Sequence, residues 1–383
     1  MQSPFIHNER PIELDRYPFA QVNRSLQAWD SSDEYIINYI NEQELLTKDP
    51  SIVVFNDSFG AIAVNLYEYN VQLINDSYIS EQGIKENFQN NFIPQENITY
   101  LDSVSDIAAP VDLIILKLPK SNAYLEYQLQ QIQKIAHPDT IIIAAARAKD
   151  IHTSTLKLFE KHLGETKTSL AVKKARLIFS TIDANKKRDL TMEKVWQLDG
   201  EKYGIADLSI ANKANVFSRD SLDIGGRYLL EQLPKIAKDS CVADLGCGNG
   251  VIGLAMLAKN PGINMHFYDE SYMAIASTKE NVINNLAEQL PQCHFHVNDC
   301  LTDVAENSLD LILCNPPFHQ QQAVTDHIAW QMFKQSYKTL KSGGELRIIG
   351  NQQLAYHIKL QRLFGNSKTI ASNKKFVVLS AKK

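Results

Sequence analysis

The chain has 383 residues, of which 44% are hydrophobic and 22% charged, and its formal net charge is −5. This length suffices for two or three domains with separate cores, and the composition is typical of a soluble globular protein without general attraction for nucleic acid. No apolar run approaches the roughly 18 residues of a membrane span, and we expect no signal peptide, because Met1–Pro4 starts without a basic and then apolar stretch.

The five cysteines all lie in the second half of the chain, and none forms a Cys-x-x-Cys pair: Cys241, Cys247, Cys293, Cys300 and Cys314. An odd number of cysteines within apolar sequence is typical of reduced core thiols. We therefore expect a cytoplasmic protein without a metal site.

The first predicted elements lie before residue 60. Prolines at positions 4, 11 and 18 indicate an extended arm over the first thirty residues, followed by a helix that carries Trp29 to Ile40. The apolar run Ile52–Phe55 is typical of a short buried strand, and it ends in a turn at Asn56.

An internal repeat follows, because Asn75–Asn91 aligns without a gap to Asp269–Asn285. The shared pairs are Ser77/Ser271, Tyr78/Tyr272, Lys85/Lys279, Glu86/Glu280, Asn87/Asn281, Asn90/Asn284 and Asn91/Asn285. Each copy follows an apolar run with a turn and precedes a short strand, Asp112–Ile115 or Asp310–Leu313. This alternation predicts two α/β domains, each with a mostly parallel sheet that has helices on both faces.

The predicted boundary lies at the polar stretch Asn185–Asp189, which separates a domain of residues 1–188 from one of residues 189–383. Just after it, Val195–Ile205 is typical of a hairpin around Asp199-Gly200. Residues 147–189 hold eleven Lys/Arg against five Asp/Glu, a surplus that suits either a phosphate-facing patch or a solvated helix face with a charged linker.

A glycine-rich turn, Asp244-Leu-Gly-Cys-Gly-Asn-Gly250, lies between a predicted strand and an apolar helix. Glycines let the backbone approach a ligand, although such a string alone also fits nicotinamide and flavin nucleotides. Asp244 would repel a pyrophosphate but suits the cationic methionine end of S-adenosylmethionine. Asp269 can accept hydrogen bonds from both ribose hydroxyls, and Asp299 from the adenine amino group.

Asn315-Pro-Pro-Phe318 follows the apolar strand Leu311–Cys314. The two prolines end the strand and present a rigid loop at the sheet edge where ligands of open α/β sheets bind. The side-chain oxygen of Asn315 and the carbonyl of Pro316 can accept both N–H groups of a planar amine and direct its lone pair at a methyl donor. Phe318 can stack on the flat substrate, which is worth roughly 1–3 kcal/mol per base.

These motifs resemble those of the ribosomal RNA guanine-N2 methyltransferases. The resemblance rests on Asp244–Gly250, Asn315–His319 and Val216-Phe-Ser-Arg219 with Leu222–Gly225, and it extends to Leu26–Asp30 and Lys149–Thr153. Among members of that family the chain is most similar to those acting on 23S RNA. The resemblance implies two tandem Rossmann-like class I methyltransferase domains with seven-stranded sheets, and ribosomal RNA as the partner. We also expect a monomer, because nothing in the sequence suggests an obligate dimer.

The resemblance also assigns functions to residues and domains. It implies that the loop with Phe217 closes over the cofactor, which completes the predicted cofactor set of Phe217, Asp244, Gly246, Gly248, Asn249, Asp269, Asp299 and Asn315. It further implies that a degenerate first domain helps to hold RNA.

The repeat indicates independently that the first domain is inactive. Asp244 aligns with Asn56, Gly246 with Ser58, Asp269 with Asn75, Asn315 with Lys117 and Phe318 with Lys120. The acids and the amine-orienting side chain are thus absent from the first copy. Lysines at this strand end and in the following basic region suit a phosphate backbone, and we expect RNA contacts from Lys117, Lys120, Lys173 and Lys174.

Three alternatives stay open at this point. The substrate can be 16S rather than 23S RNA, within the same family. A DNA adenine or protein glutamine methyltransferase uses the same tetrapeptide, but more often with Tyr in the fourth place and without the duplication. An RNA chaperone that kept the fold without turnover is disfavoured, because Asp244, Asp269 and Asn315 are intact.

Overall fold

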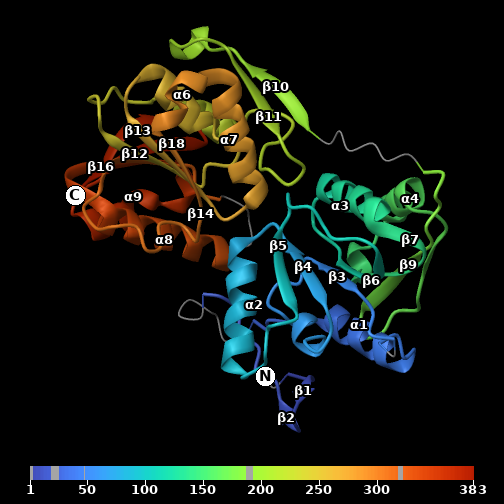
Figure 1. The fold of residues 1–383 in the computed structure, drawn as a ribbon. Coiled ribbons are helices and arrows are strands. Elements are labelled where there is room, and N and C mark those ends of the chain that lie inside the picture. The colour runs from blue at the N-terminus through green and yellow to red at the C-terminus, as the bar shows by residue number, and fades with distance from the viewer. Residues whose placement is uncertain (1–2, 19–25, 47, 187–192, 318–321) are drawn as a thin grey trace. The chain divides into compact units, whose positions relative to one another are not determined.

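The computed structural model describes residues 3–18, 26–46, 48–186, 193–317 and 322–383, with residues 322–326 described by their backbone (Figure 1). The chain divides into two compact units, Met1–Met192 and Glu193–Lys383. We call them the first and the second unit and describe each by itself. No helix of the described part is long and apolar enough to cross a membrane.

The second unit is built on a seven-stranded sheet with the strand order β14-β13-β12-β15-β16-β18-β17. Its strands are β12 Cys241–Leu245, β13 Asn264–Asp269, β14 Cys293–Val297, β15 Leu309–Cys314, β16 Leu340–Asn351, β17 Lys368–Ser372 and β18 Phe376–Lys382. The first five strands in this order pair in parallel, whereas β18 is antiparallel to both of its neighbours. From β12 the chain proceeds outward through β13 to β14, and it then returns to the other side of β12 to form β15. The direction in which strands are added therefore reverses between β12 and β15. Open α/β sheets bind ligands at such a position.

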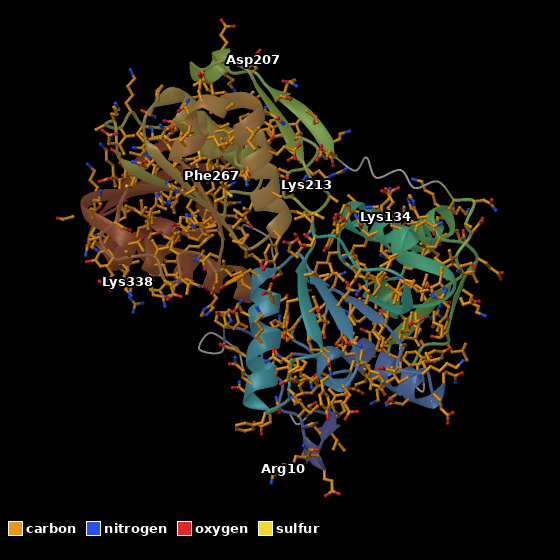
Figure 2. All side chains as sticks on the ribbon, in the orientation of Figure 1. Arg10, Lys134, Asp207, Lys213, Phe267 and Lys338 are labelled. Atoms are coloured by element: carbon orange, nitrogen blue, oxygen red, sulfur yellow. The ribbon has the colours of Figure 1, made fainter. Side chains whose placement is uncertain are left out.

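Helices cover both faces of this sheet. Figure 1 shows α6 (Val251–Lys259) and α7 (Tyr272–Leu286) on one face and α8 (Gln322–Thr339) and α9 (Tyr356–Phe364) on the other. Alternate residues of β12 serve the two cores: Val242 packs with the α6 side, whereas Ala243 and Leu245 pack with α8 and α9. The short helix α5, Ile224–Leu230, joins the α6 side, where Phe267 lies fully buried among the side chains (Figure 2).

The first unit repeats this architecture with the strand order β5-β4-β3-β6-β7-β9-β8. Its strands are β3 Ile52–Phe55, β4 Val71–Asn75, β5 Ile98–Asp102, β6 Val111–Lys117, β7 Ala136–Arg147, β8 Thr166–Thr168 and β9 Ala175–Ser180. Its helices are α1 Ser31–Glu42, α2 Tyr78–Asn90, α3 Asn122–Ile135 and α4 Thr153–His162. The predicted duplication of a mostly parallel, seven-stranded α/β fold is therefore confirmed, strand by strand.

The repeated asparagines explain much of the sequence match, because they hold equivalent segments in place. In the second unit Asn281 and Asn285 of α7 each exchange two hydrogen bonds with the backbone of strand β11 (Leu208–Asn212), at Ala211 and Ser209. In the first unit their counterparts on α2 exchange the same pairs of bonds with the backbone of Asp15 and Glu13. Residues 13–15 of the predicted arm thus take the place in the first unit that β11 has in the second.

Two predicted element boundaries are corrected by the structure. Trp29 lies before α1, which begins at Ser31 because the carboxylate of Asp30 caps it by accepting from the N–H of Ser32. The hairpin is formed by β10 (Lys194–Leu198) and β11. The second strand begins at Leu208, three residues after Ile205, where the whole hairpin was predicted to end. A tight turn does not form at Asp199-Gly200, since Gly200 has φ −74° and enters a 3₁₀ turn at Glu201–Tyr203.

Candidate active site

Three strands of the second unit end level with one another. Leu245 of β12 is in register with Tyr268 of β13 and with Cys314 of β15. The next residues along each strand are Gly246, Asp269 and Asn315, so they emerge side by side at the edge where the parallel strands end, which we call the carboxyl edge. Neighbouring strands lie about 4.8 Å apart, and the sheet therefore brings these predicted site residues together.

The glycine loop leaves β12 through three left-handed backbone positions, with φ of 75° at Gly246, 58° at Gly248 and 78° at Gly250. At Gly250 glycine is also required by space, because a Cβ would lie 2.6 Å from a methyl carbon of Thr278. By contrast, nothing lies within 4 Å of a Cβ built on Gly248. The loop is therefore packed on α7 at its end and open at its middle, as a loop that receives a ligand requires.

Asp244 lies inside the sheet just before this loop and is fully buried. Its Oδ2 accepts a hydrogen bond of 2.9 Å from the N–H of Gly253 in α6, whereas its Oδ1 has no partner among the described residues. Burial, and secondarily the charge of Asp269, raise the pKa of Asp244 to about 7, against the effect of the Gly253 bond. The carboxyl group thus fixes the glycine loop to α6 and has a buried acceptor left over.

Asp269 ends β13 and supports the loop from the neighbouring strand. Its two oxygens accept from the N–H groups of Gly248, at 2.9 Å, and Ser271, at 3.0 Å. A carboxylate oxygen can accept more than one hydrogen bond, so this arrangement is compatible with further hydroxyl donors. The site predicted for ribose hydroxyls is therefore both anchored and half-exposed.

Asp299 lies beside Asp269, because the N–H of the preceding Asn298 donates to the carbonyl of Asp269 at 2.9 Å. The Asp299 carboxylate is held by the side chain of Gln331, whose amide donates to Oδ1 at 2.9 Å. Burial raises the pKa of Asp299, and that amide opposes the shift. The predicted adenine contact thus has a rigid acceptor next to the predicted ribose contact.

The side chain of Asn249 supports the glycine loop from inside the unit. Its side chain is buried, with the amide donating to Asn212 at 2.9 Å and the oxygen accepting from the N–H of Val251. Its carbonyl also accepts from Asn281. Asn249 therefore holds the loop to β11 and α7 from within, and its contact with a cofactor stays a prediction.

Asn315 follows β15 directly and its amide has an asymmetric environment. The amide Nδ2 donates to Oδ2 of Asp223 at 3.4 Å, whereas Oδ1 is buried and has no partner among the described residues. Pro316 is buried beside it, and Phe318 lies outside the described residues, so its stacking role stays a prediction. The carboxyl edge thus presents one unsatisfied amide oxygen, which is what an amine donor needs.

The loop before α5 carries Phe217, whose side chain is 52% exposed. The loop is tied to α7 through the N–H of Lys213, which donates to the Ser277 hydroxyl at 3.0 Å. The following Ser218 takes a φ of 55°. The closure of this loop over a cofactor, which the family resemblance implies, stays a prediction.

In the first unit the corresponding edge is filled by the protein itself. The strand register pairs Phe55 with Ile74 and Leu116, so Asn56 corresponds to Gly246 and Val54 to Asp244. The alignment of Asn56 with Asp244 and of Ser58 with Gly246 was therefore wrong by two positions. The backbone agrees with this register, because Asn56 also takes a positive φ, 64°. The acid is still absent, and no glycine loop replaces it.

Asp57 closes this edge of the first unit. Its carboxylate accepts from three backbone N–H groups, those of Gly60, Ile62 and Ala63, at 2.8–3.0 Å. Burial raises the pKa of Asp57 to about 6, with the charge of Asp33 adding to the shift. A buried side chain of the protein thus binds the backbone that follows this strand end.

The four lysines expected to contact RNA are in different environments. The side chain of Lys117 is only 15% exposed and is paired with Asp30, at 3.1 Å, and with Asp33. The expectation of a phosphate contact by Lys117 is therefore corrected, because its charge is neutralised inside the unit. Lys173 pairs with Glu34 at 2.6 Å while staying exposed, and Lys120 and Lys174 are exposed.

Sequence reasoning missed the supporting residues of the site. Asp223 was noted in a motif without a role, although an Asp just before Ile-Gly-Gly is an N-cap signal, and it does cap α5 by accepting from the N–H of Gly226 at 2.8 Å. Asn212 and Asn281 bind the loop through amide contacts that no local pattern reveals. In the described part of the chain, no group of three His, Cys, Asp or Glu side chains is placed to hold a metal.

The site fits S-adenosylmethionine on structural grounds. An open glycine loop lies between a buried carboxyl with an unused oxygen and a second carboxylate at the same edge. The groups at Asp244 suit the amino acid end of the cofactor, and those at Asp269 suit its ribose. The fold and the site together define a class I methyltransferase that uses S-adenosylmethionine.

Comparison with known proteins supports this class. Residues 207–380 match the family model of the methyltransferase small domain, and residues 2–184 match that of the RLMG N-terminal domain. The T. thermophilus 16S rRNA N2 methyltransferase, solved with AdoMet and guanosine, has a similar fold, with a TM-score of 0.74, 18% identity, and coverage of 100% of this chain and 98% of that one.

Curated relatives extend over the whole chain. Proteins named ribosomal RNA large subunit methyltransferase G are 54% identical in Colwellia psychrerythraea, covering 100% of this chain and 99% of the relative, and 50% identical in Pseudoalteromonas translucida, covering 98% and 97%. A third, from Klebsiella pneumoniae, is 48% identical and covers 98% and 97%. The chain belongs to the ribosomal RNA large subunit methyltransferase G family.

Proposed function

We propose that the protein transfers a methyl group from S-adenosylmethionine to the exocyclic N2 amine of a specific guanine in 23S ribosomal RNA. The observation that carries this proposal is the buried, unsatisfied Oδ1 of Asn315 at the carboxyl edge, level with the glycine loop. The names of the relatives supply the large-subunit RNA as substrate.

The chemistry follows from the weak nucleophilicity of a ring amine. Its lone pair is delocalised, so the protein must hold the N–H groups and turn the lone pair toward the electrophile. Asn315 Oδ1 and the carbonyl of Pro316 are the two acceptors proposed for this task. Such positioning can contribute on the order of 7–11 kcal/mol to the lowering of a barrier.

When bound, S-adenosylmethionine supplies a methyl group on a positively charged sulfur. The N–C bond forms as the methyl–sulfur bond breaks, and the electron pair of that bond stays on sulfur. The nitrogen becomes acidic as it is alkylated and releases one proton to water. No side chain of this chain needs to act as a strong base, so both acceptors have only to hold the amine.

Three carboxyl groups are proposed to contact different parts of S-adenosylmethionine. Asp244 and the loop from Gly246 to Gly248 lie at the methionine end, Asp269 holds the ribose hydroxyls, and Asp299 accepts from the adenine amine. Support comes from their succession along the carboxyl edge and from the fixed orientation of each carboxylate. Phe217 is proposed to cover the bound molecule.

The first unit is proposed to bind RNA without binding the cofactor. Asp57 fills the region that corresponds to the glycine loop, and Lys117 is engaged by two carboxylates. Lys120 and Lys174, together with the exposed Lys173, remain as candidates for phosphate contacts. We also propose that the enzyme works as a monomer in the cytoplasm, where its five unpaired cysteines stay reduced.

Replacing Lys120, Lys173 and Lys174 together with Glu is expected to weaken RNA binding. Removal of one phosphate-binding lysine also lowers the salt slope of binding by about 1. Filter binding at several salt concentrations measures both quantities. Lys134→Glu, which reverses the charge of one exposed lysine at the other end of α3, is the control for a charge reversal elsewhere on the same unit. Equal affinity and slope in the triple variant and the control would exclude this RNA-binding role.

The substrate is tested by incubation of the enzyme with tritiated cofactor and with 16S or 23S RNA in separate reactions. Digestion to nucleosides is expected to yield labelled N2-methylguanosine from 23S RNA. Label in 16S RNA alone, or in another nucleoside, would contradict the proposed function. DNA and a glutamine-containing peptide serve as the substrates of the two other amine-methylating classes.

A further inference from the structure

We propose that Asp223 is a positioning residue for methyl transfer: it fixes the orientation of the Asn315 amide so that Oδ1 faces the amine. This inference rests on the proposed function and deepens it, because it assigns the group that makes Asn315 an acceptor. Asp223 lies 92 residues before Asn315 in the sequence, and the two side chains meet at the carboxyl edge.

An asparagine amide has two nearly isosteric ends, and its environment decides which end faces the substrate. If the amide of Asn315 were turned over, it would present two N–H donors to an amine that is itself a donor. An ionised carboxylate can only accept hydrogen bonds. Because Oδ2 of Asp223 lies 3.4 Å from Nδ2 of Asn315, the NH2 group is held on that side and Oδ1 is left toward the substrate.

The position of Asp223 is itself fixed. The same Oδ2 accepts from the N–H of Gly226 at 2.8 Å and so caps α5. In the first turn of α5, Gly225 and Gly226 are buried. The acceptor is therefore held by a helix start packed in the unit. The longer bond to Asn315 is of the kind that tightens when substrate binds.

The first unit provides an independent observation. Its fourth strand, β6, ends in Lys117, which corresponds to Asn315 by strand register. Lys117 lies 3.1 Å from Asp30, the residue that caps α1. The contact between a helix-capping Asp and the residue at the end of this strand thus recurs in both units. In the second unit the partner is an amide, whose two ends differ, and the contact consequently selects an orientation.

Three replacements of Asp223 separate orientation from helix capping. Asp223→Ala removes both, Asp223→Ser keeps a good cap but cannot reach Asn315, and Asp223→Asn keeps an oxygen for both donors. We expect kcat to fall roughly 10- to 100-fold in the Ala and Ser variants, with the KM values for cofactor and RNA unchanged. The kcat of Asp223→Asn is expected to lie within a few-fold of the wild-type value. Thermal unfolding should distinguish Asp223→Ala, which lacks the helix cap, from the other two variants.

An exchange of the two groups gives a second test. Asn315→Asp alone places two carboxylates side by side and should abolish most of the activity. Adding Asp223→Asn restores a donor opposite an acceptor, and we expect the double variant to exceed Asn315→Asp in kcat at least about 10-fold.

Either of two results would overturn the proposal: wild-type kcat in Asp223→Ser, or no gain in the double variant. All variants are assayed on the RNA that the wild-type enzyme methylates. A product other than N2-methylguanosine would contradict the proposed function while leaving this comparison intact.

Discussion

Asn315→Ala is expected to lower kcat by about 10³-fold or more while the affinity for S-adenosylmethionine is retained. The variant removes the one buried amide oxygen at the carboxyl edge that has no partner among the described residues. Loss of a single preorganised hydrogen-bonding group in an active site typically costs 10²–10³-fold in kcat. Here the loss is compounded because the amine can rotate once a single acceptor remains. Single-turnover assays give the rate, and calorimetry gives the cofactor affinity.

Folding and binding controls make this result specific. Asn97→Ala removes an amide of the same size from the first unit, where it donates to the backbone, and it should leave turnover unchanged. Thermal unfolding of Asn315→Ala should remain close to that of the wild type, since its Oδ1 contributes no internal hydrogen bond in the described part of the chain. Turnover near the wild-type rate would eliminate the orienting role of Asn315.

Asp269→Ala is expected to weaken cofactor binding on the order of 100-fold or more. A hydrogen bond to a charged group contributes about 1.5–3 kcal/mol, and two are proposed for the ribose. The variant also frees the N–H groups of Gly248 and Ser271, so the middle of the loop loses its side-chain anchor and the ribose bonds are removed as well, although Gly246 and Cys247 still donate to the carbonyl of Tyr268 in β13. Calorimetric titration with S-adenosylmethionine measures the change.

A matched control exists on β15, which is separated from β13 by β12. Asp310 also accepts a backbone N–H, that of Cys241 at 2.8 Å, but it lies at the opposite end of β15 and pairs with Lys341. Asp310→Ala should affect stability and leave cofactor affinity unchanged. If both variants bind the cofactor as the wild type does, Asp269 has no place in the cofactor site.

The sequence was sufficient to predict the architecture because local signals and the repeat agreed. Apolar runs marked strands that are buried on both faces, and the aligned helices α2 and α7 revealed the duplication. The order of strands in a sheet depends on contacts between segments that are distant in the sequence. A repeat that carries the motif of a known family nevertheless restricts the possible orders. The glycines and the acids at strand ends predicted a ligand loop, and the structure gives these glycines the positive φ that such a turn requires.

The failures have a common physical cause, since each depended on contacts between distant segments. The register of the first unit was displaced by two positions because strand pairing, and not residue identity, defines equivalence. Lys117 was interpreted as a surface charge, although two carboxylates from the start of α1 neutralise it. Asp223 was invisible as a partner of Asn315, because only folding brings the two together.

The unsatisfied oxygens of the second unit have a consequence for stability. Leaving a buried polar atom without a partner costs about 1–3 kcal/mol, and Asp244 and Asn315 each carry one among the described residues. In the first unit the corresponding edge is closed by Asp57 and by the ion pairs of Lys117. The carboxyl edge of the second unit therefore carries a cost in stability that a bound ligand can offset, whereas the corresponding edge of the first unit is closed by permanent contacts of its own.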